Sequence, residues 1–190
     1  DAQIGKVLDF LETYNDPFTN QPLINNTTII LIADHGYHMG QKEWAYKYSM
    51  WDDSTRVPMI ISDPNYPQGH GQVVNHPVSL VDIYPTIVEV GGKTADLPKR
   101  IISDYGTPLD GTSLVPFLQN PSLTGKQWGG SPMALSLRDT YNTDTPRDQI
   151  AAVRSENFRY IRYGSDRDAN GAYLYEEFYD YSVDPLEKTN

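Results

Sequence analysis

The residues best suited to chemistry are Asp34, His35 and Gly36, which directly follow the apolar, largely β-branched segment 28–33. Such a segment predicts a buried strand, and open α/β sheets keep their ligands at the carboxyl ends of strands. A carboxylate beside an imidazole suits a divalent cation: Ca²⁺ or Mg²⁺ among oxygen ligands, Zn²⁺ or Mn²⁺ where more imidazole is present. The alternative is an Asp–His hydrogen-bonded pair that stabilises a turn.

The elements that must position these residues are predicted from hydrophobic periodicity. Helical spacing predicts a helix at the start of the chain, one over 80–90 and a short one over 113–118, and a second apolar strand is expected at 57–62. This alternation predicts an α/β fold with a sheet flanked by helices. A β-rich tail follows, in which Ser155-Glu156-Asn157 forms a tight turn, so we expect residues 1–125 to belong to the α/β part and 126–190 to form a small antiparallel subdomain. The strands expected in this tail cover 133–137, 150–154, 158–163 and 177–181.

Composition excludes several function classes. The formal net charge of −10 argues against a nucleic acid as partner, because proteins that bind nucleic acids usually carry a basic patch. No apolar run approaches the roughly 20 residues that span a bilayer, so we expect no membrane partner. The chain has 0 cysteines, which excludes disulfides, thiolate metal ligands and a cysteine nucleophile within it.

The segment that begins at Asp34-His35-Gly36 and continues through Lys47 to Arg56-Val57-Pro58 resembles the second metal-binding segment of the sulfatases. These enzymes belong to the alkaline phosphatase superfamily, and the iduronate-2-sulfatase-like branch is the most similar. The resemblance extends over nearly the whole chain in the expected order. It includes Val78-Ser79-Leu80-Val81-Asp82, Leu109-Asp110-Gly111-Thr112-Ser113, Ala152-Val153-Arg154-Ser155-Glu156 and Tyr179-Asp180-Tyr181-Ser182-Val183.

The resemblance implies a sulfuric ester hydrolase that acts on a sulfated carbohydrate, with a mixed sheet flanked by helices. Asp34 and His35 then correspond to ligands of the active-site cation, expected to be Ca²⁺ with Mn²⁺ or Zn²⁺ as alternatives. Lys47 corresponds to a catalytic lysine that binds the sulfate group and the oxygen bridging sulfur to the leaving alcohol. An ammonium group there would stabilise the charge that develops in the transition state.

Other polar and aromatic residues permit two interpretations each. His38 and Lys42 either bind the anionic substrate from the same loop or are exposed loop residues without a role. Trp44 and Trp51 either stack on a sugar or pack, and packing is favoured. Arg56 is expected to anchor the loop through an acidic partner, and the residues expected to have structural or solvent-facing roles are Asp82, His70 and His76.

One part of the sulfatase pattern lies outside this chain. Sulfatases use a Cys or Ser within Cys/Ser-x-Pro-x-Arg that is oxidised to formylglycine, and no such segment occurs here. We therefore expect the chain to be the C-terminal portion of an enzyme, inactive without its N-terminal part. A phosphonate monoester or phosphodiester hydrolase of the same superfamily, or a non-catalytic module of that fold, remains an alternative. The resemblance also implies a periplasmic or secreted protein.

Overall fold

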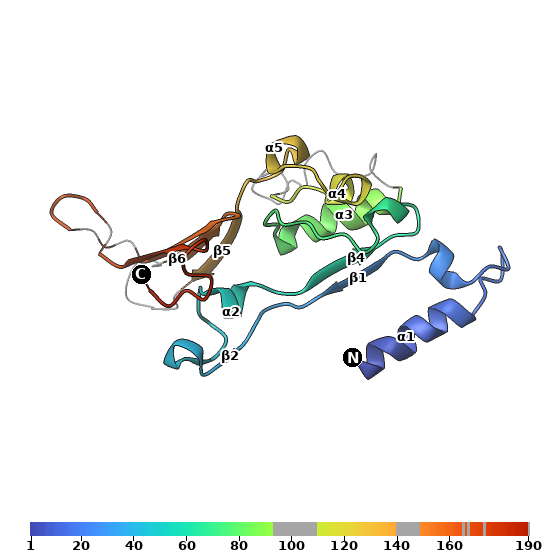
Figure 1. Ribbon diagram of the computed structural model, residues 1–190, viewed down its shortest axis with the longest axis horizontal. Helices are drawn as coiled ribbons and strands as arrows, with labels where there is room; N and C mark the ends of the chain where they lie inside the picture. Colours follow the sequence, from blue (N-terminus) through green and yellow to red (C-terminus); the bar gives the residue numbers. More distant parts are fainter. Residues whose placement is uncertain (93–109, 140–148, 165, 167, 173, 190) are drawn as a thin grey trace.

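Figure 1 shows the computed structural model, which describes residues 1–92, 110–139, 149–164, 166, 168–172 and 174–189. A two-stranded antiparallel ribbon runs through the middle of the view, with short helices along one side of it. A four-stranded antiparallel sheet lies at one end of the molecule, and the N-terminal helix lies at the other. No helix among the described residues is both long and apolar enough to cross a bilayer.

The N-terminal helix leads into the first strand. The α1 helix spans Ala2–Thr13, the 3₁₀ helix η1 spans Leu23–Asn26, and strand β1 spans Ile29–Ile32. The apolar positions of α1 recur at helical spacing, as the sequence predicts, but none of its residues is buried in this chain. Ile4, Val7 and Phe10 are exposed, so the apolar face of α1 has no cover among the described residues.

The central ribbon pairs β1 with strand β4, Met59–Ser62, in antiparallel register, with Ile29 opposite Ser62 and Ile32 opposite Met59. Between them the chain forms a small hairpin and a single helical turn that carry most of the candidate site. The elements of this excursion are β2 (His38–Met39), the 3₁₀ helix η2 (Gln41–Glu43), β3 (Ala45–Tyr46) and α2 (Asp52–Thr55).

The helices beside the ribbon are fixed by a buried polar network. The carboxylate of Asp82 accepts hydrogen bonds from the backbone N–H groups of Ser79 and Thr112, both at 2.8 Å. The fully buried Thr86 hydroxyl donates to the Asp82 carbonyl at 2.6 Å and accepts from the Leu114 N–H at 2.9 Å. Asp82 is therefore a structural residue, as expected. The elements of this region are η3 (Pro67–Gly69), η4 (Leu80–Asp82), α3 (Ile83–Val90), α4 (Val115–Gln119) and α5 (Gly125–Trp128).

Two apolar clusters make up the core. Leu114, Phe117 and Trp128 form one cluster on the helix side of the central ribbon, where Met59 and Ile61 of β4 pack against it. The second cluster joins Met50, which follows the hairpin, to the inner face of the four-stranded sheet. Its other buried members are Ala152, Ile161 and Tyr179, and Trp51 packs against them.

The four-stranded sheet has the order β5-β6-β7-β8, and every neighbouring pair is antiparallel. Its strands span Ala134–Asp139, Gln149–Arg154, Phe158–Tyr163 and Glu176–Asp180, close to the predicted ranges. The predicted turn at Ser155-Glu156-Asn157 is confirmed, because the Ser155 N–H donates to the Phe158 carbonyl at 2.9 Å. The central ribbon lies before residue 126 in the chain, and the four-stranded sheet lies after it. The division into two domains at this residue stays a prediction.

Candidate active site

The Asp34-His35-Gly36 segment leaves β1 through a close backbone contact that only glycine permits. The Gly36 N–H donates to the Ser54 carbonyl at 2.9 Å. A Cβ at position 36 would lie 2.0 Å from the carbonyl oxygen of Asp53, well inside van der Waals contact. Gly36 therefore lets the chain turn against α2 directly after the strand, and this turn aims the two preceding side chains at one place.

The hydrogen bonds of His35 determine which of its ring nitrogens is free to accept. Nδ1 lies 2.8 Å from the Gly36 carbonyl oxygen, and because a carbonyl only accepts hydrogen bonds, Nδ1 carries the proton. The lone pair of the neutral ring is then on Nε2. This nitrogen lies 3.1 Å from Lys47 Nζ and 3.5 Å from Asp34 Oδ2. The arrangement presents Nε2 in the form that a metal ion requires.

Asp34, His35 and Lys47 are thus brought together at the tip of β1. The Asp34 side chain is 87% exposed, so its carboxylate is accessible. These two donor groups fit a divalent cation, but within the described residues no group of three His, Cys, Asp or Glu side chains is arranged to hold a metal ion. A full coordination shell would need donors from outside this part of the chain. The metal, catalytic and sulfate-binding roles of the three residues stay predictions.

Lys47 lies at the end of a hairpin with an unusual backbone. Four non-glycine residues around it have positive φ angles, a conformation that side chains other than glycine rarely adopt and that occurs mainly at functional sites. They are Lys42 (54°), Glu43 (57°), Tyr46 (78°) and Tyr48 (73°). Residue types do not indicate this feature, because none of the four is glycine or asparagine.

The substrate-binding role of His38 stays a prediction, and in this structure its side chain has internal partners. His38 is 0% exposed. Its Nε2 pairs with Ser49 Oγ at 2.8 Å, and Ser49 Oγ donates to Ser54 Oγ at 2.8 Å. The ring also packs edge-on against Trp51. His38 therefore fastens the hairpin to α2 from the inside and does not reach a ligand in solvent.

The substrate-binding role of Lys42 stays a prediction as well, and in this structure its side chain turns toward the four-stranded sheet. Lys42 Nζ donates to the Tyr179 hydroxyl at 2.9 Å and lies 4.7 Å from the centre of the Trp51 ring. Burial lowers the pKa of the Lys42 ammonium, although nearby carboxylates, Glu177 first among them, oppose this shift. The Trp51 Nε1–H donates to Glu177 at 2.6 Å. These four residues tie the hairpin to β8.

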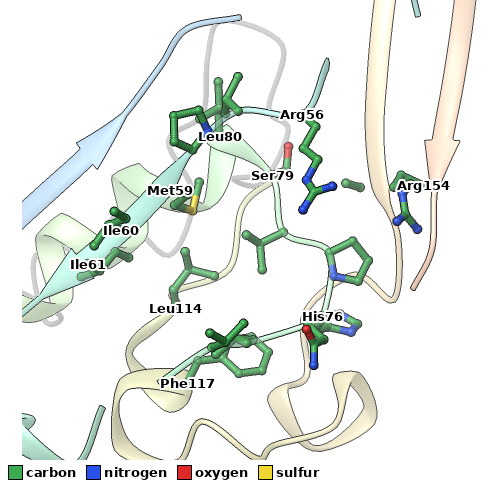
Figure 2. Close-up of a pocket in the computed structure, with 18 of the residues that line it drawn as sticks. Arg56, Met59, Ile60, Ile61, His76, Ser79, Leu80, Leu114, Phe117 and Arg154 are labelled. Atoms are coloured by element: carbon green, nitrogen blue, oxygen red, sulfur yellow. The ribbon is translucent and has the colours of Figure 1, made fainter. Parts of the chain in front are cut away.

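A cavity of about 1530 Å³ opens beside Asp34, between β4, α4 and the strands β5 and β6. Figure 2 shows the side chains of Arg56 and Arg154 on one side of this cavity and the apolar side chains of Met59, Leu114 and Phe117 on the other. Several apolar side chains that line it are exposed to solvent in this chain, among them Ile60, Val73, Leu135 and Leu137.

Comparison with known proteins shows what the chain is similar to. Residues 1–93 match the family model described as Sulfatase. A sulfatase from Formosa agariphila is 32% identical over 190 residues, which is 100% of this chain and 30% of that protein. The chain is therefore similar to sulfatases over its whole length. The iduronate-2-sulfatase-like branch stays a prediction.

Two solved structures show that the chain has the expected fold. The structure of BT4656 in complex with its substrate D-glucosamine-2-N,6-O-disulfate has a TM-score of 0.73 and 26% identity, over 100% of this chain and 33% of that one. The phosphonate monoester hydrolase of Agrobacterium radiobacter has a TM-score of 0.69 and 26% identity, over 100% and 34%. The chain therefore spans about a third of the length of the relatives it matches.

The other residues singled out in the sequence are Trp44, Trp51, Arg56, His70 and His76. Trp44 is partly exposed and packs edge-on against Trp51, so packing describes Trp51 better than sugar stacking does. Arg56 Nη1 lies 3.6 Å from Asp52 Oδ2, as expected for an anchor of the loop. His70 is exposed, as expected. His76 is not: it is buried against Phe117 and Trp128 and lies 3.2 Å from Glu156 Oε1, which corrects the prediction of a solvent-facing residue.

Two groups near the site were missed in the sequence. Arg159 is buried on β7, where it pairs with Asp52 of α2 and with Glu187 near the end of the chain. Arg138 of β5 donates a hydrogen bond to the Tyr48 carbonyl, next to Lys47. Residue spacing does not indicate these contacts. Arg138 and Tyr48 are 90 residues apart in the sequence, and Arg159 and Asp52 are 107 residues apart.

Proposed function

We propose that the protein of which these residues form a part is a sulfuric ester hydrolase that acts on a sulfated carbohydrate. The observation that carries this proposal is the convergence of Asp34, His35 and Lys47 within the part of the chain that matches the sulfatase model. A carboxylate, an imidazole with a free lone pair and an ammonium group at one exposed place suit the binding of a sulfate ester and a cation.

In this proposal Lys47 binds the sulfate group and stabilises the oxygen that becomes the leaving alcohol. Asp34 and His35 would hold a divalent cation, with Ca²⁺ preferred and Mn²⁺ or Zn²⁺ as alternatives. Such a cation would supply Lewis-acid polarisation of the sulfate oxygens. The Gly36 carbonyl keeps His35 Nδ1 protonated, which maintains the acceptor on Nε2. His38 and Lys42 support the hairpin from behind.

The formylglycine nucleophile and the further metal ligands would come from the N-terminal part of the enzyme. We propose that this part packs against the cavity beside Asp34 and against the exposed apolar face of α1. Two observations support this occupant: the relatives are about three times as long as the chain, and the cavity is lined by exposed apolar residues. A periplasmic or secreted location is part of the same proposal and follows from the family resemblance alone.

The proposal of a carbohydrate substrate rests on similarity to other proteins. The substrate bound in the BT4656 structure is a disulfated glucosamine, and an N-acetylglucosamine-6-O-sulfatase from Bacteroides thetaiotaomicron is 26% identical to this chain. The second candidate function is hydrolysis of phosphonate monoesters or phosphodiesters, which the similarity to the Agrobacterium radiobacter enzyme favours. Both reactions place an anionic ester against Lys47.

The test is an assay of the intact protein on a sulfated monosaccharide, an aryl sulfate and an aryl phosphonate monoester. We expect kcat/KM for the sulfate esters to exceed that for the phosphonate by at least about 100-fold, equivalent to roughly 3 kcal/mol of transition-state discrimination. Chelation of divalent cations should abolish the activity, and Ca²⁺ should restore it. A preference for the phosphonate would establish the second candidate function. The absence of activity on all of these esters would favour the alternative that the protein is a non-catalytic module of this fold.

A further inference from the structure

We propose that Arg138, which lies beside Lys47, gives this site a second anion-binding position, which takes a sulfate or carboxylate group of the substrate other than the ester that Lys47 binds. The proposal rests on the proposed function and specifies its substrate: a carbohydrate that carries at least two acidic groups. Arg138 lies on β5, outside the segment that carries Lys47 and the metal-binding pair.

Geometry places the two cations around one exposed ring. Lys47 Nζ lies 5.4 Å from the centre of the Tyr48 ring, and Arg138 Cζ lies 5.6 Å from the same centre. Tyr48 is 62% exposed, so a ligand in solvent can approach this ring and the two cations beside it. The Arg138 Nη1–H donates to the Tyr48 carbonyl, which holds the guanidinium beside the residue that follows Lys47.

The charges nearby indicate that these two cations are available to an anion. The chain is acidic, with a formal net charge of −10, and most of the described arginines have carboxylate partners. Arg56, Arg154 and Arg159 each lie within 4.0 Å of the Asp52 carboxylate. Among the described residues, neither Lys47 nor Arg138 has an Asp or Glu oxygen within that distance. Unpaired cations that gather at one place in an acidic protein attract an anionic ligand.

The backbone beside the two cations supports a binding role. Tyr46 and Tyr48, on either side of Lys47, both have positive φ angles, and such conformations persist where the surroundings enforce them, mainly at ligand sites. Arg138 contributes to this enforcement at Tyr48 through the carbonyl contact. Its planar guanidinium has further N–H donors in a fork that matches a sulfate or carboxylate group.

The experiment compares two substrates of the intact enzyme: a monosaccharide with one sulfate, and the same sugar with a second sulfate. Arg138→Gln should raise KM for the disulfated sugar about 10-fold or more, the loss expected for one charge-assisted hydrogen bond. Because Arg138 also holds the Tyr48 carbonyl, the variant's kcat/KM for the monosulfated sugar should fall as well, but by a clearly smaller factor than for the disulfated sugar. Arg138→Lys keeps the charge but not the planar fork of donors. Its KM for the disulfated sugar should lie between the values of the wild type and of Arg138→Gln. Lys126→Gln, which removes an exposed charge on α5, is the matched control and should change neither value.

An equal loss on both substrates would overturn the subsite, because it would mean that Arg138 acts only by holding the Tyr48 carbonyl. The salt dependence of the wild type provides a second measure that needs no variant. KM for the disulfated sugar should rise more steeply with ionic strength than KM for the monosulfated sugar. Equal salt dependence would also overturn the subsite while leaving the hydrolase intact. A wild type that cleaves neither sugar would refute the proposed function itself, and the subsite with it.

Discussion

At the scale of single residues, the pairing of His35 with Lys47 depends on one proton. The Gly36 carbonyl holds that proton on Nδ1, so Nε2 is an acceptor, and the Lys47 ammonium is the nearest donor at 3.1 Å. An ammonium group in this position lies beside the proposed cation site without a carboxylate partner among the described residues. It can therefore donate to a sulfate oxygen without first breaking an ion pair.

Replacement of Lys47 tests this role. Lys47→Met keeps most of the alkyl chain and removes the charge, and we expect kcat/KM of the intact enzyme to fall about 10²–10³-fold, the usual loss for one transition-state donor. The melting temperature should stay within a few degrees, because the side chain is not part of either core cluster. Lys126→Met should retain full activity. A Lys47→Met enzyme with wild-type kinetics would exclude Lys47 from the chemistry.

The sequence predicts which residues gather at the end of β1. It does not predict which side chains of the same segment are covered by other parts of the chain. Asp34, His35 and Lys47 are close in the chain, and a strand followed by glycine is a local signal. His38 and Lys42 belong to the same segment, yet their environments are set by Trp51 and by Tyr179, the second of which is 137 residues from Lys42. Local patterns cannot distinguish a loop residue that faces solvent from one covered by a distant strand.

At the scale of elements, strands and the longer helices are predicted well, and single turns are not. The four-stranded sheet is predictable because alternation and the Ser155 turn are local signals. The two-residue strands β2 and β3 and the one-turn helices α2 and α5 are too short to show periodicity. The long stretch at 93–109 lies outside the described residues.

The join between α3 and α4 gives a prediction at this scale. Thr86 bridges the Asp82 carbonyl and the Leu114 N–H from a fully buried position. Thr86→Val keeps the shape but leaves the Leu114 N–H without its partner, so the intact protein should lose about 1–3 kcal/mol of stability in urea unfolding. Thr86→Ser retains the hydroxyl and should lose less than half as much. Equal losses in the two variants would show that the methyl group matters and the hydrogen bonds do not.

At the scale of the whole molecule, Arg159 joins the four-stranded sheet to the site-bearing segment. Its guanidinium contacts the Asp52 carboxylate, the Met50 carbonyl at 2.9 Å and Glu187, which in turn accepts from the Asp52 N–H at 3.0 Å. The Arg159 side chain is 3% exposed, whereas Arg56, which shares Asp52 as a partner, is 78% exposed.

These two arginines form a matched pair of variants. Arg159→Met leaves two carboxylates in the interior without their buried partner and should cost about 3–5 kcal/mol of unfolding free energy. Arg56→Met removes an exposed ion pair with the same aspartate and should cost less than about 1 kcal/mol. Chemical denaturation of the intact protein measures both. Comparable costs would mean that the buried network contributes no more than a surface pair.

The tie between the hairpin and β8 has a consequence for genetics. Glu177 and Tyr179 hold Trp51 and Lys42 from positions 126 and 137 residues away, and so they control the loop that presents Lys47. A screen for loss-of-function alleles would recover changes at these two codons alongside those at Asp34 and His35. On a linear gene map these changes would form a separate cluster that belongs to the same defect.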